Sequence, residues 1–480
     1  MTEPAPVAAG PVAPVLVHES DWLASRPFFY NLRTGAASHD INDVIDLDAL
    51  EFDPEGFNDY LDFGFSVFER TPVRDVRLLR HSSRLWRDPD GSLRVEYLDD
   101  PAYPWLERRS TVSEVLELAG ARINEAAGEA GDIVVPTSGG CDSRLINLLL
   151  RDRSRIRAFT YGVSDDPRRS AEAVKARELA HRLGLQWRLV PLGDFHEFLD
   201  DWDALFGVST HAHGMYHMEF YRRILQWVPV GSALLSGACG EWFEGDDPEV
   251  RVIPTLRDPD DVYTVFRYGR LNADSTYSRF RSERLGAQRL LETEPRIRDE
   301  MLPRVFTVVR IRLTLLSYLL SVPAAFGLEP RAPFLDIDLA MRMLTLPDEL
   351  REERRWLYRY FAESGVDLEG TALPVDNRNT LNYRGMRRRP LRPLDPGILR
   401  EVVRPDYVRR VNLEVGTLGL TWEALWRLGW TPGFRRAVNV ARRWGLTERR
   451  LDAYGAYLTL LPIEKLLRRR DDVARGRCGS

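Results

Sequence analysis

An alternation of apolar strands and amphipathic helices between residues 112 and 235 constrains the fold of this 480-residue chain more than any other feature. The apolar pattern predicts strands at 133–135, 156–161, 186–190 and 233–235. It predicts helices at 112–127, 143–151, 168–183, 195–206 and 217–227. A helix between two strands carries the chain back to the end of the sheet at which the first strand began, so the second strand runs parallel to the first. This order therefore predicts an α/β fold whose parallel sheet is covered by helices on both faces.

The regions on either side of this alternation follow other patterns. Residues 1–110 have an Ala/Pro-rich start and then short strand-like pieces at 64–68, 76–79 and 93–97. Beyond residue 257 the pattern is helical, with interruptions near 330–333 and 370–395. We therefore predict a small β-rich domain at 1–110, an α/β domain at 111–350 and a mostly helical C-terminal part at 351–480.

The loop after the first predicted strand has the composition of an anion-binding site. Its sequence is Ser138-Gly139-Gly140-Cys141-Asp142-Ser143, and an amphipathic helix follows. Two glycines let the backbone approach a ligand closely, and free N–H groups at a helix start point at negative charge. The two serines add hydroxyl donors, and Asp142 places a carboxylate where it can hold Mg²⁺. The spacing is neither that of the Walker loop nor that of the Rossmann fingerprint.

Composition argues against several classes of protein. The 67 basic and 72 acidic side chains give a net charge of −5, so no global field attracts nucleic acid or an anionic membrane. Three cysteines are too few for a disulfide framework. The apolar stretch 313–328 is short for a membrane span and contains Pro323, which predicts a buried helix followed by a turn. Because the start lacks a secretory pattern, we expect a soluble cytoplasmic protein.

The loop and three further segments resemble one enzyme family. Ser-Gly-Gly-x-Asp-Ser at the end of a first strand resembles the pyrophosphate loop of the N-type ATP pyrophosphatases, which have the PP-loop, HUP-like fold. Segments 159–184, 234–241 and 327–336 resemble the synthetase domain of asparagine synthetases, the last with the sequence Gly-Leu-Glu-Pro-Arg-Ala-Pro-Phe-Leu-Asp. The resemblance implies a five-stranded sheet, ATP and Mg²⁺ as cofactors, and transfer of AMP to a carboxylate before an amine displaces it.

The resemblance also implies roles for individual residues. The implied ATP-binding residues are Ser138, Gly139, Gly140, Asp142, Ser143, Tyr161 and Gly237. Mg²⁺ would be held by Asp142 and by Glu241, which stands where the family has an aspartate.

Glu329 matches a glutamate that forms half of a Tyr–Glu acid/base pair in lactam-forming relatives. The partner position is Ala238, which cannot move a proton. Glu329 is therefore a candidate catalytic residue that deprotonates or orients the incoming ammonium. The alternative is an ion pair with Arg331 or another arginine.

The scarcity of lysine limits which residue could neutralise the charge of the departing pyrophosphate. Lys175 and Lys465 are the only lysines among the 67 basic residues. The family uses a late lysine to neutralise charge at this step, and the matching stretch here contains Arg378, the second candidate catalytic residue. Arg384 and Arg387 are rivals, and a solvated arginine is the alternative for each of the three.

Residues 1–110 resemble a truncated, degenerate glutaminase domain. Asparagine synthetases begin with a catalytic cysteine after Met removal, whereas residue 2 here is Thr2. Segment 71–97 resembles the last strands of that domain, and Thr2 as an N-terminal nucleophile is the remaining alternative. The acyl acceptor would then be free ammonia, ammonia from a partner, or an amine, as in β-lactam synthetases and lasso-peptide cyclases.

His211, His213 and His217 form a further candidate cluster. Their spacing lacks the carboxylate of common metal sites, so a substrate-pocket lining and ordinary packing are the alternatives to metal binding.

The leading hypothesis is an ATP-dependent, AMP-forming amide synthetase, a carbon–nitrogen ligase of natural-product or peptide tailoring. Its substrates would be small-molecule or peptide carboxylates and amines, with an ammonia-supplying or carrier protein as an open option and no nucleic-acid or membrane partner. The alternatives are a catalytically degenerate nucleotide-binding partner protein and a PP-loop tRNA-modifying enzyme.

Overall fold

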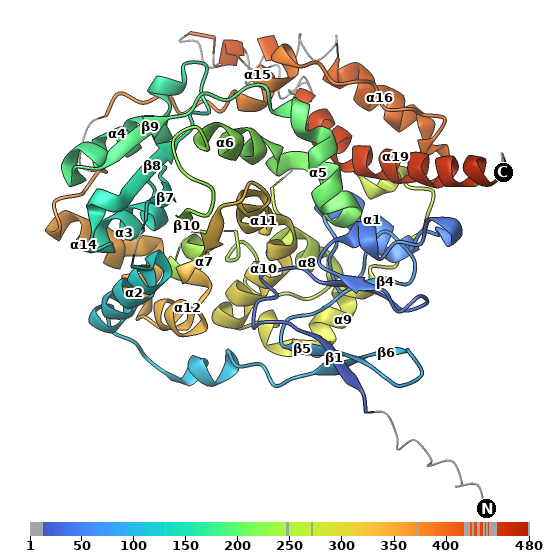
Figure 1. Ribbon diagram of the computed structural model, residues 1–480, viewed down its shortest axis with the longest axis horizontal. Helices are drawn as coiled ribbons and strands as arrows, with labels where there is room; N and C mark the ends of the chain where they lie inside the picture. The colour runs from blue at the N-terminus through green and yellow to red at the C-terminus, as the bar shows by residue number, and fades with distance from the viewer. Residues whose placement is uncertain are drawn as a thin grey trace, which may run out of the picture.

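A five-stranded, all-parallel sheet organises the computed structural model (Figure 1). The model describes residues 13–129, 131–245, 249–269, 272–369, 373–416, 423–424, 427–429, 433–434, 437, 440 and 449–478. The strands are β7 (Ile133–Pro136), β8 (Ile156–Thr160), β9 (Gln186–Leu189), β10 (Ala233–Leu235) and β11 (Glu329–Arg331). The structure thus confirms an α/β fold with a parallel sheet of five strands.

The strand order β11-β10-β7-β8-β9 places the first strand of the sheet, β7, in its centre. The chain adds β8 and β9 on one side of β7, then crosses back and adds β10 and β11 on the other. The direction of winding therefore reverses between β7 and β10. In open α/β sheets the crevice at such a reversal, outside the carboxyl ends of the strands, is where ligands bind.

Helices cover both faces of the sheet. The helices α2 (Val112–Ala127), α3 (Cys141–Leu149) and α4 (Ala171–Leu183) contact its strands, and α5 (Leu199–Phe206) and α6 (Tyr216–Ile224) follow β9 in the chain. In β7 the consecutive residues Ile133, Val134 and Val135 are all fully buried. Since neighbouring side chains on a strand point to opposite faces, both faces of β7 are covered.

Local capping explains why α2 starts where the sequence predicts. Thr111 accepts a hydrogen bond from the backbone of Glu114, whose side chain in turn accepts one from the backbone of Thr111. This capping box fixes the first turn.

Residues 13–100 form two small antiparallel sheets and one α-helix. One sheet contains β1 (Val15–Glu19), β5 (Ser83–Arg87) and β6 (Leu93–Tyr97). The other contains β2 (Phe29–Asn31), β3 (Ala37–Ser38) and β4 (Val76–Leu78), and α1 (Pro54–Phe63) precedes β4. The strand predicted at 64–68 is wrong, because Gly64 and Phe68 adopt positive φ angles of 81° and 55° and turn the chain.

These residues pack against the rest of the molecule. The indole of Trp22 donates to the carbonyl of Leu335 at 2.9 Å, and the hydroxyl of Tyr60 donates to the carbonyl of Thr459 at 3.1 Å. The side chains of Trp22 and Tyr60 belong to the same hydrophobic core as the parallel sheet. The proposed domain boundaries at 110 and 350 stay predictions.

The remainder of the described chain is mostly helical. Its helices are α7 (Gly240–Glu244), α8 (Pro259–Phe266), α9 (Leu285–Thr293), α10 (Met301–Leu316), α11 (Tyr318–Ala325), α12 (Ile337–Leu344), α13 (Asp348–Arg351), α14 (Arg355–Glu363), α15 (Leu381–Arg388), α16 (Pro405–Val415) and α19 (Arg450–Cys478). The interruption predicted at 370–395 is only partly correct, since α15 lies within it; residues 370–372 lie outside the described chain.

The apolar stretch in α10 and α11 is part of the core. Met301–Ala325 contains an 18-residue window with a mean hydropathy of 1.7, so this span is long and apolar enough to cross a membrane, but 78% of that window is buried inside the protein. Such burial is the character of a core helix in a soluble globular protein. The predicted buried helix is therefore present, although Pro323 lies inside α11 rather than ending it.

Candidate functional site

The carboxyl ends of β7, β8 and β10 open into a cavity of about 400 Å³. One side of it, here called the polar wall, consists of the loop after β7 and the turn after β10, with Ser138, Asp142, Ser143, Gly237 and Glu241. A second part of the lining, here called the aromatic wall, comes from the end of β8, α6 and α11, with Tyr161, Tyr216, His217, Phe220 and Tyr318. The cavity therefore gathers most of the residues that the sequence marks as a nucleotide site.

Gly139 fits the polar wall because it has no side chain. Its φ is +72°, and a Cβ there would lie 2.5 Å from the Cβ of Lys175 in α4. Both the left-handed backbone and the contact with α4 exclude a larger residue. The β7 loop is thereby pressed against α4.

Hydrogen bonds within the loop hold its hydroxyls at the start of α3. The N–H of Gly140 donates to Oγ of Ser138 at 3.2 Å, and the N–H of Ser138 donates to Oγ of Ser143 at 3.3 Å. Gly140 is the N-cap of α3, so the first N–H groups of this helix lie beside the cavity without intrahelical acceptors. This is a favourable place for negative charge.

Arg144 holds the loop after β7 in place. Its buried guanidinium donates to the carbonyl of Gly139 at 2.8 Å and to both carboxylate oxygens of Glu369 at 2.7 and 2.9 Å. Although burial opposes ionisation, the hydrogen bonds and charge of Arg144 lower the pKa of Glu369 to about 2. Arg144 directly follows the motif in the sequence, but the sequence does not identify Glu369 as its partner.

Asp142 fits tightly against the turn after β10. A Cβ on Gly237 would lie 2.7 Å from the Cβ of Asp142, and a Cβ on Gly240 would lie 2.9 Å from its Oδ1. Cys239 between these glycines has a φ of +63°, which is uncommon for a residue with a side chain. Burial and the nearby Glu241 and Asp142 raise the pKa of its thiol well above the usual value.

Glu244 is a further carboxylate that the motifs do not indicate. It is fully buried at the end of α7, and burial followed by the charge of Asp142 raises its pKa well above the usual value. Arg354 lies 3.8 Å away on its other side. The polar wall is thus rich in carboxylate oxygens, the ligands that Mg²⁺ prefers. In the described part of the chain, no three metal-binding side chains form a ready-made metal site.

The aromatic wall is a cluster of neutral rings. The Tyr161 ring lies 5.7 Å from that of Tyr216 and 5.3 Å from that of Phe220, and its hydroxyl is 3.5 Å from Nε2 of His217. Burial raises the pKa of Tyr161 well above its usual value. Burial and His213 lower the pKa of His217 to about 3. This wall suits an apolar or aromatic group rather than an anion.

The histidines of the predicted cluster, His211, His213 and His217, lie in different environments. His217 lines the cavity, which matches the substrate-pocket alternative. His211 packs against Gly64 in the N-terminal region, where a Cβ would lie 3.1 Å from its Nδ1. Burial lowers the pKa of His213 to about 4.

Glu172 adds a carboxylate to the cavity that sequence reasoning missed as a functional residue. It lies in the first turn of α4 and lines the cavity near Tyr161. Its Oε2 is buried and has no hydrogen-bond partner among the described residues. A carboxylate that lines the cavity can accept a hydrogen bond from a ligand.

Glu329 lies outside this cavity. It is the first residue of β11 and pairs with Ala233, the first residue of β10, so it lies at the amino end of the sheet, opposite the polar wall. Its side chain is 58% exposed and forms a 3.0 Å ion pair with Arg331. This geometry matches the ion-pair alternative and counts against catalysis.

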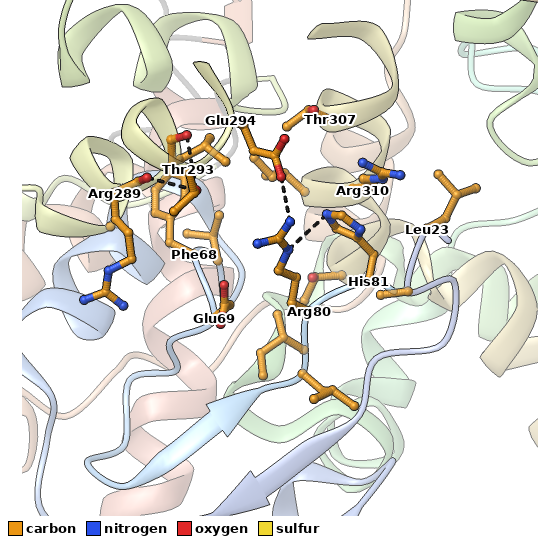
Figure 2. A pocket seen from close by; sticks show the side chains of 18 of the residues that line it. Leu23, Phe68, Glu69, Arg80, His81, Arg289, Thr293, Glu294, Thr307 and Arg310 are labelled. Carbon is orange, nitrogen blue, oxygen red and sulfur yellow. Dashed lines mark hydrogen bonds and ion pairs between the residues drawn. The ribbon is translucent and has the colours of Figure 1, made fainter. Parts of the chain in front are cut away.

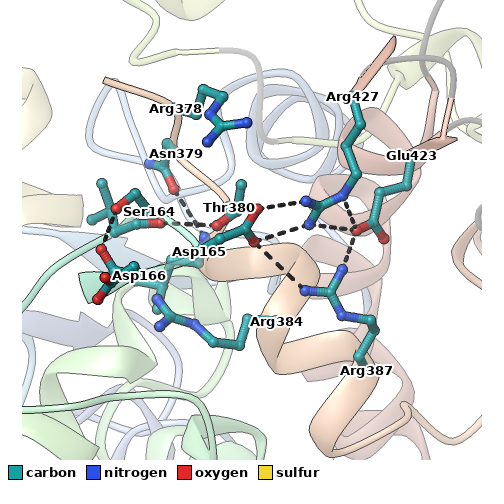
Figure 3. A network of polar contacts seen from close by, with 12 residues as sticks. Ser164, Asp165, Asp166, Arg378, Asn379, Thr380, Arg384, Arg387, Glu423 and Arg427 are labelled. Atoms are coloured by element: carbon teal, nitrogen blue, oxygen red, sulfur yellow. Dashed lines mark hydrogen bonds and ion pairs between the residues drawn. The ribbon is translucent and has the colours of Figure 1, made fainter. Parts of the chain in front are cut away.

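The three candidate arginines differ in their partners. Arg378 forms a two-point contact with Asp376 at 2.8 and 2.7 Å. Arg387 pairs with Glu423 and lies 3.9 Å from Asp165, in the network of Figure 3.

Arg384 has no carboxylate within ion-pair distance in the described chain. It donates from Nη2 to the carbonyl of Gly162 at 3.1 Å, directly after Tyr161, and its buried Nε has no hydrogen-bond partner there. Burial lowers its pKa. Arg384 is therefore the best placed of the three to accept a phosphate.

The side-chain ammonium groups of the two lysines already have partners. Lys175 lies 3.6 Å from Glu369, and Lys465 donates to the carbonyl of Leu199 at 2.7 Å.

No protein-family model matches the chain, and no curated protein matches it either.

Proposed function

We propose that the protein is an ATP-dependent, AMP-forming amide synthetase, an asparagine synthetase-like member of the PP-loop, HUP-like N-type ATP pyrophosphatases without a working glutaminase domain. One observation carries this proposal. The loop Ser138-Gly139-Gly140-Cys141-Asp142-Ser143 follows the central strand of the parallel sheet and opens on the cavity at the reversal of strand order. That is the position where an open α/β sheet binds a nucleotide.

The residues of the polar wall fit ATP with Mg²⁺. The N–H groups at the start of α3 and the hydroxyls of Ser138 and Ser143 suit phosphate oxygens. Asp142 and Glu241 would hold Mg²⁺, which supplies positive charge to the phosphates when bound. Gly237 and Tyr161 line the same cavity and would contact the rest of the nucleotide.

The adenylation step needs orientation and charge neutralisation. A substrate carboxylate oxygen attacks the α-phosphorus, forming a P–O bond while the bond to pyrophosphate breaks. The donors of the β7 loop would stabilise the charge that develops on phosphorus. Arg384, rather than Arg378, would neutralise the departing pyrophosphate.

Amide formation needs a group that receives a proton from the amine. We assign this role to Glu172 in place of Glu329, because Glu172 lines the cavity and Glu329 does not. The ammonium gives one proton to the Glu172 carboxylate and the amine attacks the acyl carbon. The bond from the acyl carbon to AMP then breaks, and the second amine proton passes to the departing phosphate. The aromatic wall would hold an apolar part of the acid or the amine.

Product analysis tests the activity. The protein is incubated with ATP, Mg²⁺, a panel of natural-product and peptide carboxylic acids, and ammonia or amines. The proposal predicts AMP and pyrophosphate in amounts equal to the amide formed. Formation of ADP, or tight ATP binding without turnover under any combination, would favour a purely nucleotide-binding role.

Hydroxylamine separates the role of Glu172 from that of the nucleotide site. It stays largely unprotonated at neutral pH, so it needs no base. We expect Glu172→Gln to lose amide formation with an alkylamine while it keeps hydroxamate formation. Glu178→Gln on the same helix, whose partner is Arg182 at 2.7 Å, is the matched control. Equal loss with both nucleophiles would instead place Glu172 at the nucleotide.

The location proposed for this reaction is the cytoplasm, where ATP is available. The substrate class, natural-product or peptide tailoring, is part of the same proposal, and so is the option of a partner that supplies ammonia or carries the acid.

A further inference from the structure

Aromatic rings are concentrated in the cavity at the carboxyl ends of β7, β8 and β10. Besides the aromatic wall, Trp242 on α7 and Tyr268 after α8 belong to its lining. Another cavity, between the N-terminal region and helices α9 and α10, shares no lining residue with it, and its apolar side chains are mostly aliphatic (Figure 2). The gathering of rings is therefore a property of the proposed adenylation site and not of every cavity in the molecule.

Trp242 and Tyr268 place rings beside Glu241, one of the two residues that would hold Mg²⁺. Trp242 directly follows Glu241 in α7, and its ring centroid lies 6.4 Å from that of Tyr268. Burial, followed by the charge of Glu241, raises the pKa of Tyr268 above its usual value. These rings therefore lie near the phosphates of a bound nucleotide, where the carboxylate of the acid has to meet the α-phosphorus.

Tyr318 on α11 continues this group of rings. Burial, followed by Tyr216 and Tyr268, raises the pKa of Tyr318 well above its usual value, so the three hydroxyls lie close together. Tyr216 and Tyr268 are half-buried, so part of each side chain stays uncovered in the lining. Aromatic rings pair favourably with other rings, in stacked or edge-to-face arrangements. The lining therefore suits an aromatic group on the acid.

The charges of the lining disfavour a second negative group on the acid. In the described chain the ionised side chains of the lining are three carboxylates, and no lysine or arginine belongs to it: Asp142, Glu172 and Glu241. Arg384 donates to the carbonyl of Gly162, and neither residue is part of the lining. His217 is neutral at pH 7, because burial lowers its pKa to about 3. A second carboxylate would be desolvated among like charges without a cationic partner.

We propose that the acid activated at this site is a monocarboxylic acid that carries an aromatic ring, such as an arylalkanoic acid, and that dicarboxylic acids are poor substrates. The ring of the acid contacts Trp242, Tyr268 and Tyr318. Its carboxylate faces the polar wall, where one oxygen bonds to the α-phosphorus as the bond to pyrophosphate breaks. This inference rests on the proposed synthetase function and specifies the acid that it uses.

Three acids test the proposal in ATP–pyrophosphate exchange with the full chain. They are 3-phenylpropionate, hexanoate, which has an alkyl chain in place of the ring, and glutarate, which has a second carboxylate. We expect kcat/KM for 3-phenylpropionate to exceed that for glutarate by at least about tenfold. It should exceed that for hexanoate several-fold, because only the phenyl ring pairs with the rings of the lining.

Two variants locate the preference for the ring. Trp242→Leu and Tyr268→Leu should each lower the ratio of 3-phenylpropionate to hexanoate activity several-fold. The ratio is measured within one protein, so a smaller folded fraction does not change it. Phe68→Leu makes the same kind of change in the cavity of Figure 2 and should leave the ratio unchanged.

Exchange that is equally fast with glutarate or hexanoate, or a ratio unchanged in both variants, would overturn the aromatic acid and retain the synthetase. Equilibrium dialysis of labelled 3-phenylpropionate separates the two proposals. Saturable binding that both variants weaken, without exchange for any acid, would retain the aromatic site and contradict the synthetase. Absence of saturable binding would overturn the aromatic site.

Discussion

The two walls of the cavity at the carboxyl ends of β7, β8 and β10 are built in different ways. The polar wall is specified by backbone geometry, since Gly139, Gly237 and Gly240 each occupy a place that a side chain would fill. The aromatic wall is specified by packing, since its rings come from β8, α6 and α11, which are far apart in the sequence. A change to the polar wall should therefore act on the chemistry of the nucleotide, and a change to the aromatic wall should act on stability and on the second substrate.

The largest expected effect concerns Arg384, the cation to which we assign the departing pyrophosphate. Removal of a group that stabilises transition-state charge costs about 10²–10³ in kcat. We expect such a loss for Arg384→Ala. Arg378→Ala, which removes a guanidinium already paired with Asp376, should cost less than about fivefold. Steady-state kinetics of pyrophosphate release compare the two, and the reverse order would return the role to Arg378.

The next effect tests how rigidly the backbone shapes the polar wall. Gly139→Ala forces a methyl group against Lys175 at a positive φ, so the β7 loop must move. A displacement of about 1 Å in a reacting group can cost 10²-fold in rate, and we expect a loss of that size in kcat/KM for ATP. Gly91→Ala has a similar φ of +86° but open space around it, and is the control for backbone strain alone. Equal losses of activity would show that the contact with α4 is unimportant.

The aromatic wall should appear in the pH dependence of stability. The pKa of His217 is lowered from 6.5 to about 3, so its neutral form is favoured in the fold. Its contribution is complete above pH 6.5 and is lost as the pH falls towards 3, because the unfolded chain takes up the proton first. Between pH 7 and 5, His217→Phe should lose about 2 kcal/mol less unfolding free energy than the wild type. Denaturant titrations at pH 7 and pH 5 measure the free energy of unfolding, and His181→Phe, at an exposed site, is the control. An equal loss of unfolding free energy in the wild type, His217→Phe and His181→Phe would contradict this prediction.

The smallest effect is a gain in stability. Cys239 has a φ of +63°, a backbone conformation that residues with a side chain rarely adopt. Cys239→Gly relieves this strain and should stabilise the fold by about 0.5–1 kcal/mol, because the strain relieved exceeds the added flexibility of the unfolded chain. Thermal unfolding detects the change, and a lower melting temperature would show that the buried thiol contributes more through packing than the turn loses through strain.

The difference between the walls also explains how much could be predicted. The order of strands and helices and the β7 loop follow from local patterns, such as the capping box at Thr111 and the buried run 133–135. Glu172 and Glu244 join the site through tertiary packing, which no local pattern of this single sequence reports.

Glu329 shows the converse limit. Its motif identifies the segment, but the side chain lies at the start of β11 and not at its carboxyl end. Only the strand register distinguishes the two ends of so short a strand.

ATP–pyrophosphate exchange tests the central claim most directly. The wild-type protein, Mg²⁺, ATP and labelled pyrophosphate are combined with each acid of a panel, without an amine. We predict acid-dependent exchange in the wild type and its loss, by at least about 10²-fold, in Asp142→Ala, whose carboxylate lies in the polar wall. Full exchange activity in Asp142→Ala, or bound ATP without exchange for every acid, would contradict the assignment of the β7 loop as the site of adenylation.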